Sequence, residues 1–453
     1  MAAEAMLADG AGVSVSHGLA LLDIVKHALR TVIQLLNGKD RLAIVAYSNT
    51  ASVILELTPM TPEGQQRAEL RLHQLIPDGM TNLWAGLETG IQLLAAASDG
   101  LRLQHLLLLT DGIPNINPPR GIVPMLKRLK DKCGGRLPCS VNTFGFGYEL
   151  DSELLHELAR LSSASYAFIP DAGFVGTVFV NAVTNLLVTM GANPVLTLTA
   201  DQGASLPLCA VPGGLVVKQV AGGLQVELSS LQFGQTRHVL VRGAPITGAL
   251  SANLDYCTRN RNRRNASLTC RLCQLPAAEG SIDQKARVLL VDGVRMAMSA
   301  LKQTNLDKLK DMPLPLPTAQ EQIKQLETSI RALGGISEAV EALLEDLSGQ
   351  VAEAFSREEW YTRWGIHFLP SLLCAHACQQ CNNFKDPGVQ HYGGELFGDL
   401  RDKADEVFCN LEAPKPQPRP SLPKALPAPA APSRPVQAAR VVDMSVYYDA
   451  SAG

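Results

Sequence analysis

The residue best placed to bind a ligand is Asp111, which follows four consecutive leucines in the segment QHLLLLTDGIP at residues 104–114. An apolar run with a polar start and a Thr-Asp-Gly end is typical of a parallel strand buried on both faces. In open α/β sheets, ligands bind at the loops that follow the carboxyl ends of the strands. The sequence therefore predicts a carboxylate at a ligand-binding edge, with an ordinary Asp-Gly turn as the alternative.

Cysteine, a residue type that can bind metals, forms the second set of candidate residues. Cys257, Cys270 and Cys273 include one C-x-x-C pair, but three thiolates fall short of the four ligands of a structural zinc site. We therefore interpret residues 257–280 as a basic surface loop with incidental cysteines. Its arginines have no interleaved aromatic residues, which argues against nucleic-acid binding.

A third set lies near the end of the chain, where three cysteines fall at i, i+4 and i+7 of a predicted helix and three histidines lie nearby. These are Cys374, Cys378, Cys381, His367, His376 and His391. A zinc site is conceivable there. Cysteine also packs as a small apolar residue, so we favour a buried helix face over a metal site.

Strands and helices alternate over about the first 190 residues. Apolar runs predict strands at residues 41–47, 51–57, 106–110, 139–146 and 165–169. Periodicity predicts helices at residues 21–36, 62–75, 83–97, 123–132, 151–161 and 175–189. Residues 1–18 give no periodic signal. The alternation predicts an α/β domain over residues 1–191, with a doubly wound, mostly parallel sheet.

The rest of the chain changes character. Short alternating stretches in residues 192–256, among them 237–242, predict a small β-sandwich-like module. Residues 281–411 have the periodicity of a helical domain. Residues 412–440 are rich in proline and alanine, which is typical of a disordered linker, and residues 441–453 form a short tail.

Composition and the motifs that are missing exclude several classes of function. The 453-residue chain has a net charge of −3, with 46% hydrophobic and 18% charged residues, so nothing in it favours nucleic acid or a membrane surface. We find no signal peptide and no apolar run near the roughly 20 residues of a membrane span, which predicts an intracellular, cytoplasmic protein. P-loop, Gly-x-Ser-x-Gly, His-Glu-x-x-His and dinucleotide-binding motifs are missing. We therefore expect no enzymatic activity and no small-molecule substrate.

Three segments resemble the von Willebrand factor A (VWA) family over roughly residues 12–190. They are RLAIVAYSNTA from residue 41, GMTNLWAGLETGIQLL from residue 79 and HLLLLTDGIPN from residue 105. The family carries a metal-ion-dependent adhesion site (MIDAS), built from a first-loop Asp-x-Ser-x-Ser, a second-loop Thr and an Asp after a later strand. Matched position by position, the resemblance assigns Ser14, Ser16, Thr81 and Asp111 to this site. The first-loop aspartate is replaced by Gly12, and residues 1–11 match the family's preceding strand poorly.

The resemblance implies that Mg²⁺ or Mn²⁺ is the cofactor, because hard cations take oxygen ligands. Ser14, Ser16, Thr81 and Asp111 supply three hydroxyls and one carboxylate, with Asp9 as an alternative to the missing aspartate. An acidic side chain of a protein partner would complete the shell. The expected function is therefore protein–protein interaction through a partial adhesion site.

A second resemblance covers WGIHFLPSLLCAHACQQCNNFKDPGVQHYGG at residues 364–394. This motif is similar to the domain that follows VWA domains in proteins with a Hedgehog/intein-like (Hint) autoprocessing domain. In that family a segment like Tyr447-Tyr448 leads into the Hint domain. The alternative function is thus the N-terminal part of a self-processing precursor whose catalytic domain is absent from this chain.

Overall fold

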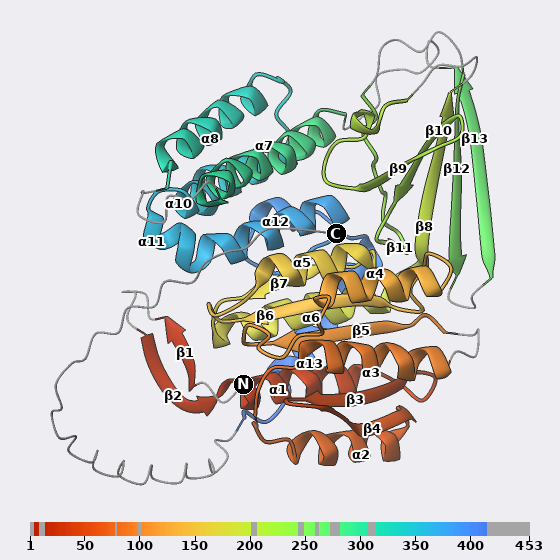
Figure 1. Ribbon diagram of the computed structural model, residues 1–453, viewed down its shortest axis with the longest axis vertical. Helices are drawn as coiled ribbons and strands as arrows, with labels where there is room; N and C mark the ends of the chain where they lie inside the picture. The colour runs from red at the N-terminus through yellow and green to blue at the C-terminus, as the bar shows by residue number, and fades with distance from the viewer. Residues whose placement is uncertain are drawn as a thin grey trace, which may run out of the picture. The chain divides into compact units, whose positions relative to one another are not determined.

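The apolar runs of the first 190 residues form a parallel sheet and a separate hairpin in the computed structural model (Figure 1). The structure describes residues 4–8, 14–77, 79–97, 102–200, 206–242, 249–258, 262–271, 281–306 and 314–414. Among them, β5 (His105–Thr110), β6 (Ser140–Phe146) and β7 (Tyr166–Ile169) pair in parallel, in that order. The hairpin consists of β3 (Arg41–Tyr47) and β4 (Ala51–Pro59).

Helices cover both faces of these strands, which confirms the predicted doubly wound fold. The first face packs against α1 (Leu21–Leu35), α6 (Val175–Leu187) and α13 (Glu395–Asn410). The second packs against α3 (Leu83–Ala96), α4 (Ile122–Lys132) and α5 (Ser152–Leu161), while α2 (Pro62–His73) packs beside β4. Alternate residues of β6 supply the two cores, with Phe144 and Phe146 on the α1 side and Val141 on the α3 side.

One edge of the parallel sheet, at β5, faces β3. Helix α3 lies against both strands, because Gly86 abuts the ring of Tyr47 and Gly90 abuts Leu106. In the described part of the chain, however, β5 pairs with β6 and β3 pairs with β4, and no strand joins β3 to β5. Of the four leucines of β5, Leu108 is buried and the other three are half-buried. The prediction of full burial on both faces is wrong, because this edge has no strand neighbour among the described residues.

The opposite edge, at β7, is covered by α12 (Ile366–Cys378). Side chains of α12 accept hydrogen bonds from the strand backbone: Ser371 Oγ from Phe168 N at 3.1 Å and Cys374 Sγ from Tyr166 N at 3.4 Å. Cys378 Sγ lies 3.9 Å from the carbonyl oxygen of Ala164. The helix therefore satisfies the exposed amides that would otherwise make an edge strand prone to pair with another chain.

The predicted cysteine face is confirmed for Cys374 and Cys378, both buried on α12. Cys381 is also buried but lies beyond the end of the helix, because Gln379 adopts a left-handed conformation with φ 49°. Its placement on the same helix face is therefore wrong. The described residues contain no group of three or more His, Cys, Asp or Glu side chains arranged to hold a metal ion.

The N-terminal residues form a hairpin of β1 (Glu4–Ala8) and β2 (Ser14–Ala20), where no strand is predicted from the residue pattern. β2 continues directly into α1. At this junction the carboxylate of Asp23 accepts a hydrogen bond from Ala20 N at 2.9 Å. A carboxylate in the first turn stabilises the helix start.

The strands after α6 form one antiparallel sheet of six strands within the described residues. They are β8 (Thr189–Ala200), β9 (Val216–Val220), β10 (Gly223–Glu227), β11 (Ser230–Gln232), β12 (Ala249–Thr258) and β13 (Arg263–Arg271), with η3 (Leu208–Ala210) beside them. The order is β13-β12-β8-β10-β9, and β11 pairs with β8. Residues 237–242, predicted as a strand, have no regular secondary structure.

Part of the predicted basic loop at residues 257–280 is a strand, β13, which corrects that interpretation. It pairs along its whole length with β12. Polar cross-strand contacts support the pairing: Asn265 Nδ2 donates to Asp255 Oδ1 at 3.0 Å, and the hydroxyls of Ser251 and Thr269 lie 2.8 Å apart. The interpretation as a loop rested on the basic residues and the incomplete cysteine set, and neither of these excludes a polar edge strand. Cys273 lies outside the described residues.

The C-terminal region is helical, as predicted for residues 281–411. Its long helices are α7 (Ser281–Leu306), α8 (Leu316–Arg331), α9 (Glu338–Asp346), α12 and α13. Short turns complete it: η5 (Leu347–Val351), α10 (Ala352–Ala354), α11 (Glu358–Trp360), η6 (Tyr361–Gly365) and η7 (Pro387–Val389). No described helix has the length and apolar content to cross a membrane. The predicted linker and tail, from residue 415 onward, lie outside the described residues.

Candidate functional site

Thr81 and Asp111 lie in neighbouring loops, as their assignment to one site requires. Asp111 follows the carboxyl end of β5, and Thr81 precedes α3. Thr81 N donates to Asn115 Oδ1 at 2.8 Å, and Asn115 N donates to the carbonyl oxygen of Thr81 at 3.2 Å. A methyl group added to Gly112 would lie 3.6 Å from Thr81 Oγ1. The structure therefore fixes the two loops against each other.

A third loop, at Ser48 and Asn49 after β3, also belongs to this cluster. Asn49 Oδ1 accepts a hydrogen bond from Met80 N at 3.0 Å, and Ser48 O accepts one from Asn82 N at 2.8 Å. We did not predict the roles of Asn49 and Asn115. For Asn49 the signal was the same as for Asp111, namely polar residues directly after a strand, whereas Asn115 lies further along the loop that follows β5.

Tyr47 connects the β3 and β5 sides of the cluster. Its hydroxyl donates to the carbonyl oxygen of Leu109 at 2.7 Å. Burial raises the pKa of Tyr47, and the negative charge of Asp111 raises this pKa further. The phenol therefore stays protonated at neutral pH. It acts as a donor that bridges β3 and β5, which do not pair with each other, close to the Asp111 carboxylate.

The other two predicted ligands, Ser14 and Ser16, lie on β2 rather than in a loop between a strand and a helix. Their Cα partners across the hairpin are Ala8 and Met6, respectively. The first-loop geometry implied by the resemblance is therefore not present at the backbone. Their side chains lie outside the described parts of the structure, as do Asp9 and Gly12.

The described donors fit a hard cation in kind but only partly in number. Thr81 contributes a hydroxyl and Asp111 a carboxylate, and both side chains are half-exposed. Mg²⁺ is commonly held by one or two carboxylates together with waters and ligand oxygens. These two residues alone therefore make an incomplete site, which needs the serines, a partner or water to complete it.

Apolar side chains surround the two loops and point into solvent. Ile76 is 63% exposed, Met80 49% and Ile113 57%. Met80 immediately precedes Thr81, and Ile113 lies two residues after Asp111. Exposed apolar residues around polar groups are typical of protein-interaction surfaces.

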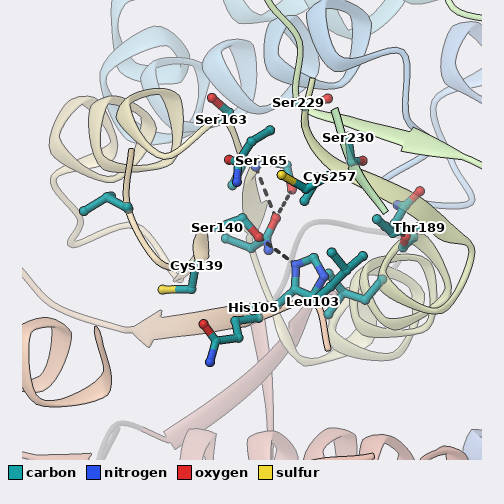
Figure 2. A pocket seen from close by; sticks show the side chains of 18 of the residues that line it. Leu103, His105, Cys139, Ser140, Ser163, Ser165, Thr189, Ser229, Ser230 and Cys257 are labelled. Atoms are coloured by element: carbon teal, nitrogen blue, oxygen red, sulfur yellow. Dashed lines mark hydrogen bonds between the residues drawn. The ribbon is translucent and has the colours of Figure 1, made fainter. Parts of the chain in front are cut away.

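A cavity of about 230 Å³ lies at the other ends of the strands, where the parallel sheet meets the antiparallel sheet (Figure 2). Its lining includes His105 and Ser140 at the starts of β5 and β6, and Ser230 on β11. The His105 Nδ1 and Ser140 Oγ atoms lie 2.6 Å apart. Ser165 Oγ donates to Asn142 Oδ1 at 2.9 Å. Because the lining is uncharged and these polar groups bond to one another, the cavity has the character of a junction between two sheets.

The fold and the loop cluster define an α/β domain with polar residues at the carboxyl ends of its strands. Comparison with known families gives the class: residues 13–177 match the von Willebrand factor type A domain, and residues 337–406 match the family described as VWA / Hh protein intein-like. The chain thus contains a VWA domain followed by a VWA/Hh intein-like segment. Both resemblances stated from the sequence are confirmed.

Individual relatives resemble parts of the chain. Inter-alpha-trypsin inhibitor heavy chain H3 of Pongo abelii is 28% identical over 194 residues, which are 40% of this chain and 22% of that protein. The uncharacterized protein YfbK of Escherichia coli K12 is 25% identical over 174 residues, which are 37% of this chain and 29% of that protein. The chain therefore spans less than a third of these curated relatives.

Among solved structures, a von Willebrand factor type A protein from Catenulispora acidiphila has a TM-score of 0.52 at 14% identity. The match covers 72% of this chain and 78% of that one. This likeness extends beyond the α/β domain and supports the overall fold of a parallel sheet, an antiparallel sheet and a helical segment.

Proposed function

We propose that the protein is a protein-interaction module whose binding surface is the loop cluster at the carboxyl ends of β3 and β5. VWA domains generally mediate protein–protein interactions. The observation that carries the proposal is the exposure of Met80 and Ile113 beside Thr81 and Asp111. An apolar rim around a hydrogen-bonded polar centre offers both buried area and specificity to a partner.

A divalent cation, Mg²⁺ or Mn²⁺, is the finer part of the proposal. Thr81 and Asp111 would hold it, and Ser14 and Ser16 would join them if β2 leaves its hairpin. The cation would supply positive charge that attracts an acidic side chain of the partner. Asp111 is the only carboxylate in this proposed ligand set, so its removal is the most damaging single change.

Affinity capture with the whole chain tests the interaction. The double variant Met80→Ser, Ile113→Ser removes the apolar rim, and Asp111→Ala removes the carboxylate. Asp131→Ala, an exposed aspartate on α4, is the matched control. We expect partners retained by the wild-type chain and by the control to be lost from both loop variants. Equal retention by all four proteins would contradict the proposed surface.

The cation is tested in the same format. Addition of a chelator during capture should release the partners from the wild-type chain if the metal forms part of the interface. Retention in chelator, together with loss in the Met80→Ser, Ile113→Ser variant, would keep the surface and remove the metal from the proposal.

A further inference from the structure

A second cavity, of about 290 Å³, lies where the carboxyl end of β7 meets the VWA/Hh intein-like segment. The parallel-sheet side contributes Tyr148, Phe168, Asp171 and Phe174, which come from the ends of β6 and β7 and from η1 (Ala172–Phe174). The helical side contributes Glu353, Trp364, Phe368, Ser371, Asn383 and Asp386. Neither the family matches nor the loop cluster assigns a role to this cavity. Its volume suits one small chemical group rather than an extended ligand.

The walls of the cavity are aromatic. Tyr148 and Phe168 have ring centroids 6.0 Å apart, and Trp364 and Phe368 have centroids 5.7 Å apart. Within each pair the two ring planes are inclined by 59°, so the two rings of a pair present their faces in different directions. The face of an aromatic ring carries partial negative charge, which attracts cations.

The protein's own cations already use two of these rings. Lys385 Nζ lies 3.7 Å from the ring centroid of Phe174, and Arg363 Cζ lies 5.2 Å from that of Tyr148. Both lie within the distance at which a cation over a ring is stabilised. These contacts show that the aromatic rings at this junction attract positive charge.

Carboxylates add negative charge around the rings. Of the three acidic residues in the lining, Glu353 is exposed, Asp171 is half-buried and Asp386 is buried. Burial raises the pKa of Asp386 to about 6, against the hydrogen bond from Asn383 and the charge of Lys385, so the group is mostly ionised above pH 7. These three acidic residues line the cavity, whereas the two basic residues that contact its rings, Lys385 and Arg363, are not part of the lining, so the lining carries net negative charge.

We propose that this cavity binds an organic cation, an alkylammonium or guanidinium group, against the rings of Trp364 and Phe368, with Glu353 and Asp171 as counter-charges. The same chemistry has two sources, a free quaternary ammonium compound or a lysine or arginine side chain of a protein. A bare metal ion does not suit aromatic walls, since hard cations require several oxygen ligands. The site is distinct from the proposed interaction surface, so the two stand or fall separately.

Calorimetric titration of the whole chain tests the proposal with matched ligands. Choline represents a free cation, and 3,3-dimethylbutan-1-ol is its neutral analogue of the same shape. Nα-acetyl-lysine methylamide represents a protein side chain, and its Nε-acetylated form is the neutral counterpart. We expect the cation of at least one pair to bind about threefold to thirtyfold more tightly than its neutral partner.

Two variants locate the binding. Trp364→Leu keeps an apolar side chain but removes a ring, and Glu353→Gln removes a charge at an exposed position where folding is not at risk. Glu341→Gln on α9, also exposed, is the control. Both site variants should weaken the binding of the cation about threefold or more, and the control should not.

The ligand preference measured in the titrations distinguishes the two possible sources of the cation. Preference for choline alone indicates a free cation, and preference for the lysine derivative indicates a protein side chain; either supports the site. Equal binding of charged and neutral ligands, no binding of any ligand, or unchanged affinity in Glu353→Gln and Trp364→Leu overturns it.

Discussion

The two edge strands of the β5-β6-β7 sheet differ in what covers them. At β7, helix α12 packs along the strand, and Ser371 and Cys374 accept hydrogen bonds from its backbone. At the other edge, the neighbouring strand β3 pairs with β4 but not with β5. The hydroxyl of Tyr47 on β3 bridges the gap by donating to the carbonyl oxygen of Leu109 on β5. All four residues of β7 are buried, whereas most leucines of β5 are half-buried.

The two edges therefore differ in role. The β7 edge, which α12 covers and which we call the closed edge, supports the fold, and the β5 edge, which we call the open edge, carries the binding loops. The closed edge joins the VWA domain to the VWA/Hh intein-like segment through groups that lie inside the protein. The open edge carries the loops of Thr81 and Asp111, which have few covering elements and an exposed apolar rim. Regions with fewer buried contacts open more readily, and binding loops are commonly drawn from them. Changes at the closed edge should therefore affect stability, and changes at the open edge should affect binding.

The largest effect is expected at His367, which is 2% exposed and joins α12 to α5 and to the loop after β6 through both ring nitrogens. Its Nδ1 lies 2.6 Å from Ser152 Oγ, and its Nε2 lies 3.0 Å from the carbonyl oxygen of Tyr148. His367→Ala should lower the free energy of unfolding by about 3 kcal/mol, because it leaves a cavity and unpaired buried polar groups.

Denaturant unfolding of the whole chain measures this effect. His73→Ala, at an exposed position on α2, is the control and should change the free energy of unfolding by less than about 0.5 kcal/mol. Equal effects of the two substitutions would show that α12 does not stabilise the sheet edge.

The next effect depends on pH and concerns Asp346, which is buried at the end of α9 beside Asp386. Burial, with the charge of Asp386 adding to it, raises the pKa of Asp346 to about 8, although Gly388 N donates to its Oδ2 at 2.8 Å. A raised carboxyl pKa means that the folded protein holds a proton which the unfolded chain releases. The stability from this group is therefore present below its ordinary pKa and lost as the pH rises through about 8.

Asp346→Asn resembles the protonated carboxyl and cannot titrate. Relative to the wild-type protein, it should gain free energy of unfolding on the order of 2 kcal/mol between pH 5 and pH 8. Unfolding midpoints at the two pH values test this. A constant difference between the two proteins would mean that Asp346 is ionised throughout this range.

A smaller pair of effects compares the two edges directly. Ser371→Ala removes the acceptor for Phe168 N and leaves a buried amide unpaired, which should cost about 1 to 2 kcal/mol. Tyr47→Phe removes the buried donor itself and leaves only the Leu109 carbonyl oxygen, an acceptor, without this bond, so it should cost about 1 kcal/mol or less. Both are read from denaturant midpoints. A larger loss from Tyr47→Phe would reverse the assignment of the closed edge as the better supported one.

Local patterns predicted most of the α/β domain. The apolar run at residues 41–47 and the four leucines before Asp111 gave the strands within one residue, because burial of apolar side chains dominates there. Edge strands were harder to predict from the sequence. β13 is held by cross-strand polar pairs and by its neighbour β12, which no local periodicity records. The half-burial of Leu107 and Leu109 depends on their strand having no partner at one edge in the described part of the chain, which is also not a local property.

The candidate site was predicted to a similar extent. Thr81 and Asp111 lie together because each follows or precedes a regular element whose position the pattern fixes. Ser14 and Ser16 were placed in a loop by the resemblance, but their backbone pairs with β1. Asn49 and Asn115 bring the loops together through hydrogen bonds between residues distant in sequence, and sequence spacing alone does not reveal such contacts.

The central claim is that the Thr81 and Asp111 loops form a metal-dependent binding site at the open edge, and Mn²⁺ titration by calorimetry tests it most directly. The whole chain is compared with Asp111→Ala and with the control Asp131→Ala. The account predicts weak binding, micromolar to millimolar on the order of magnitude for incomplete oxygen sites, which Asp111→Ala abolishes and the control retains. Equal Mn²⁺ binding by the wild-type chain and Asp111→Ala, or none by the folded wild-type chain, would contradict a metal-dependent site at these loops.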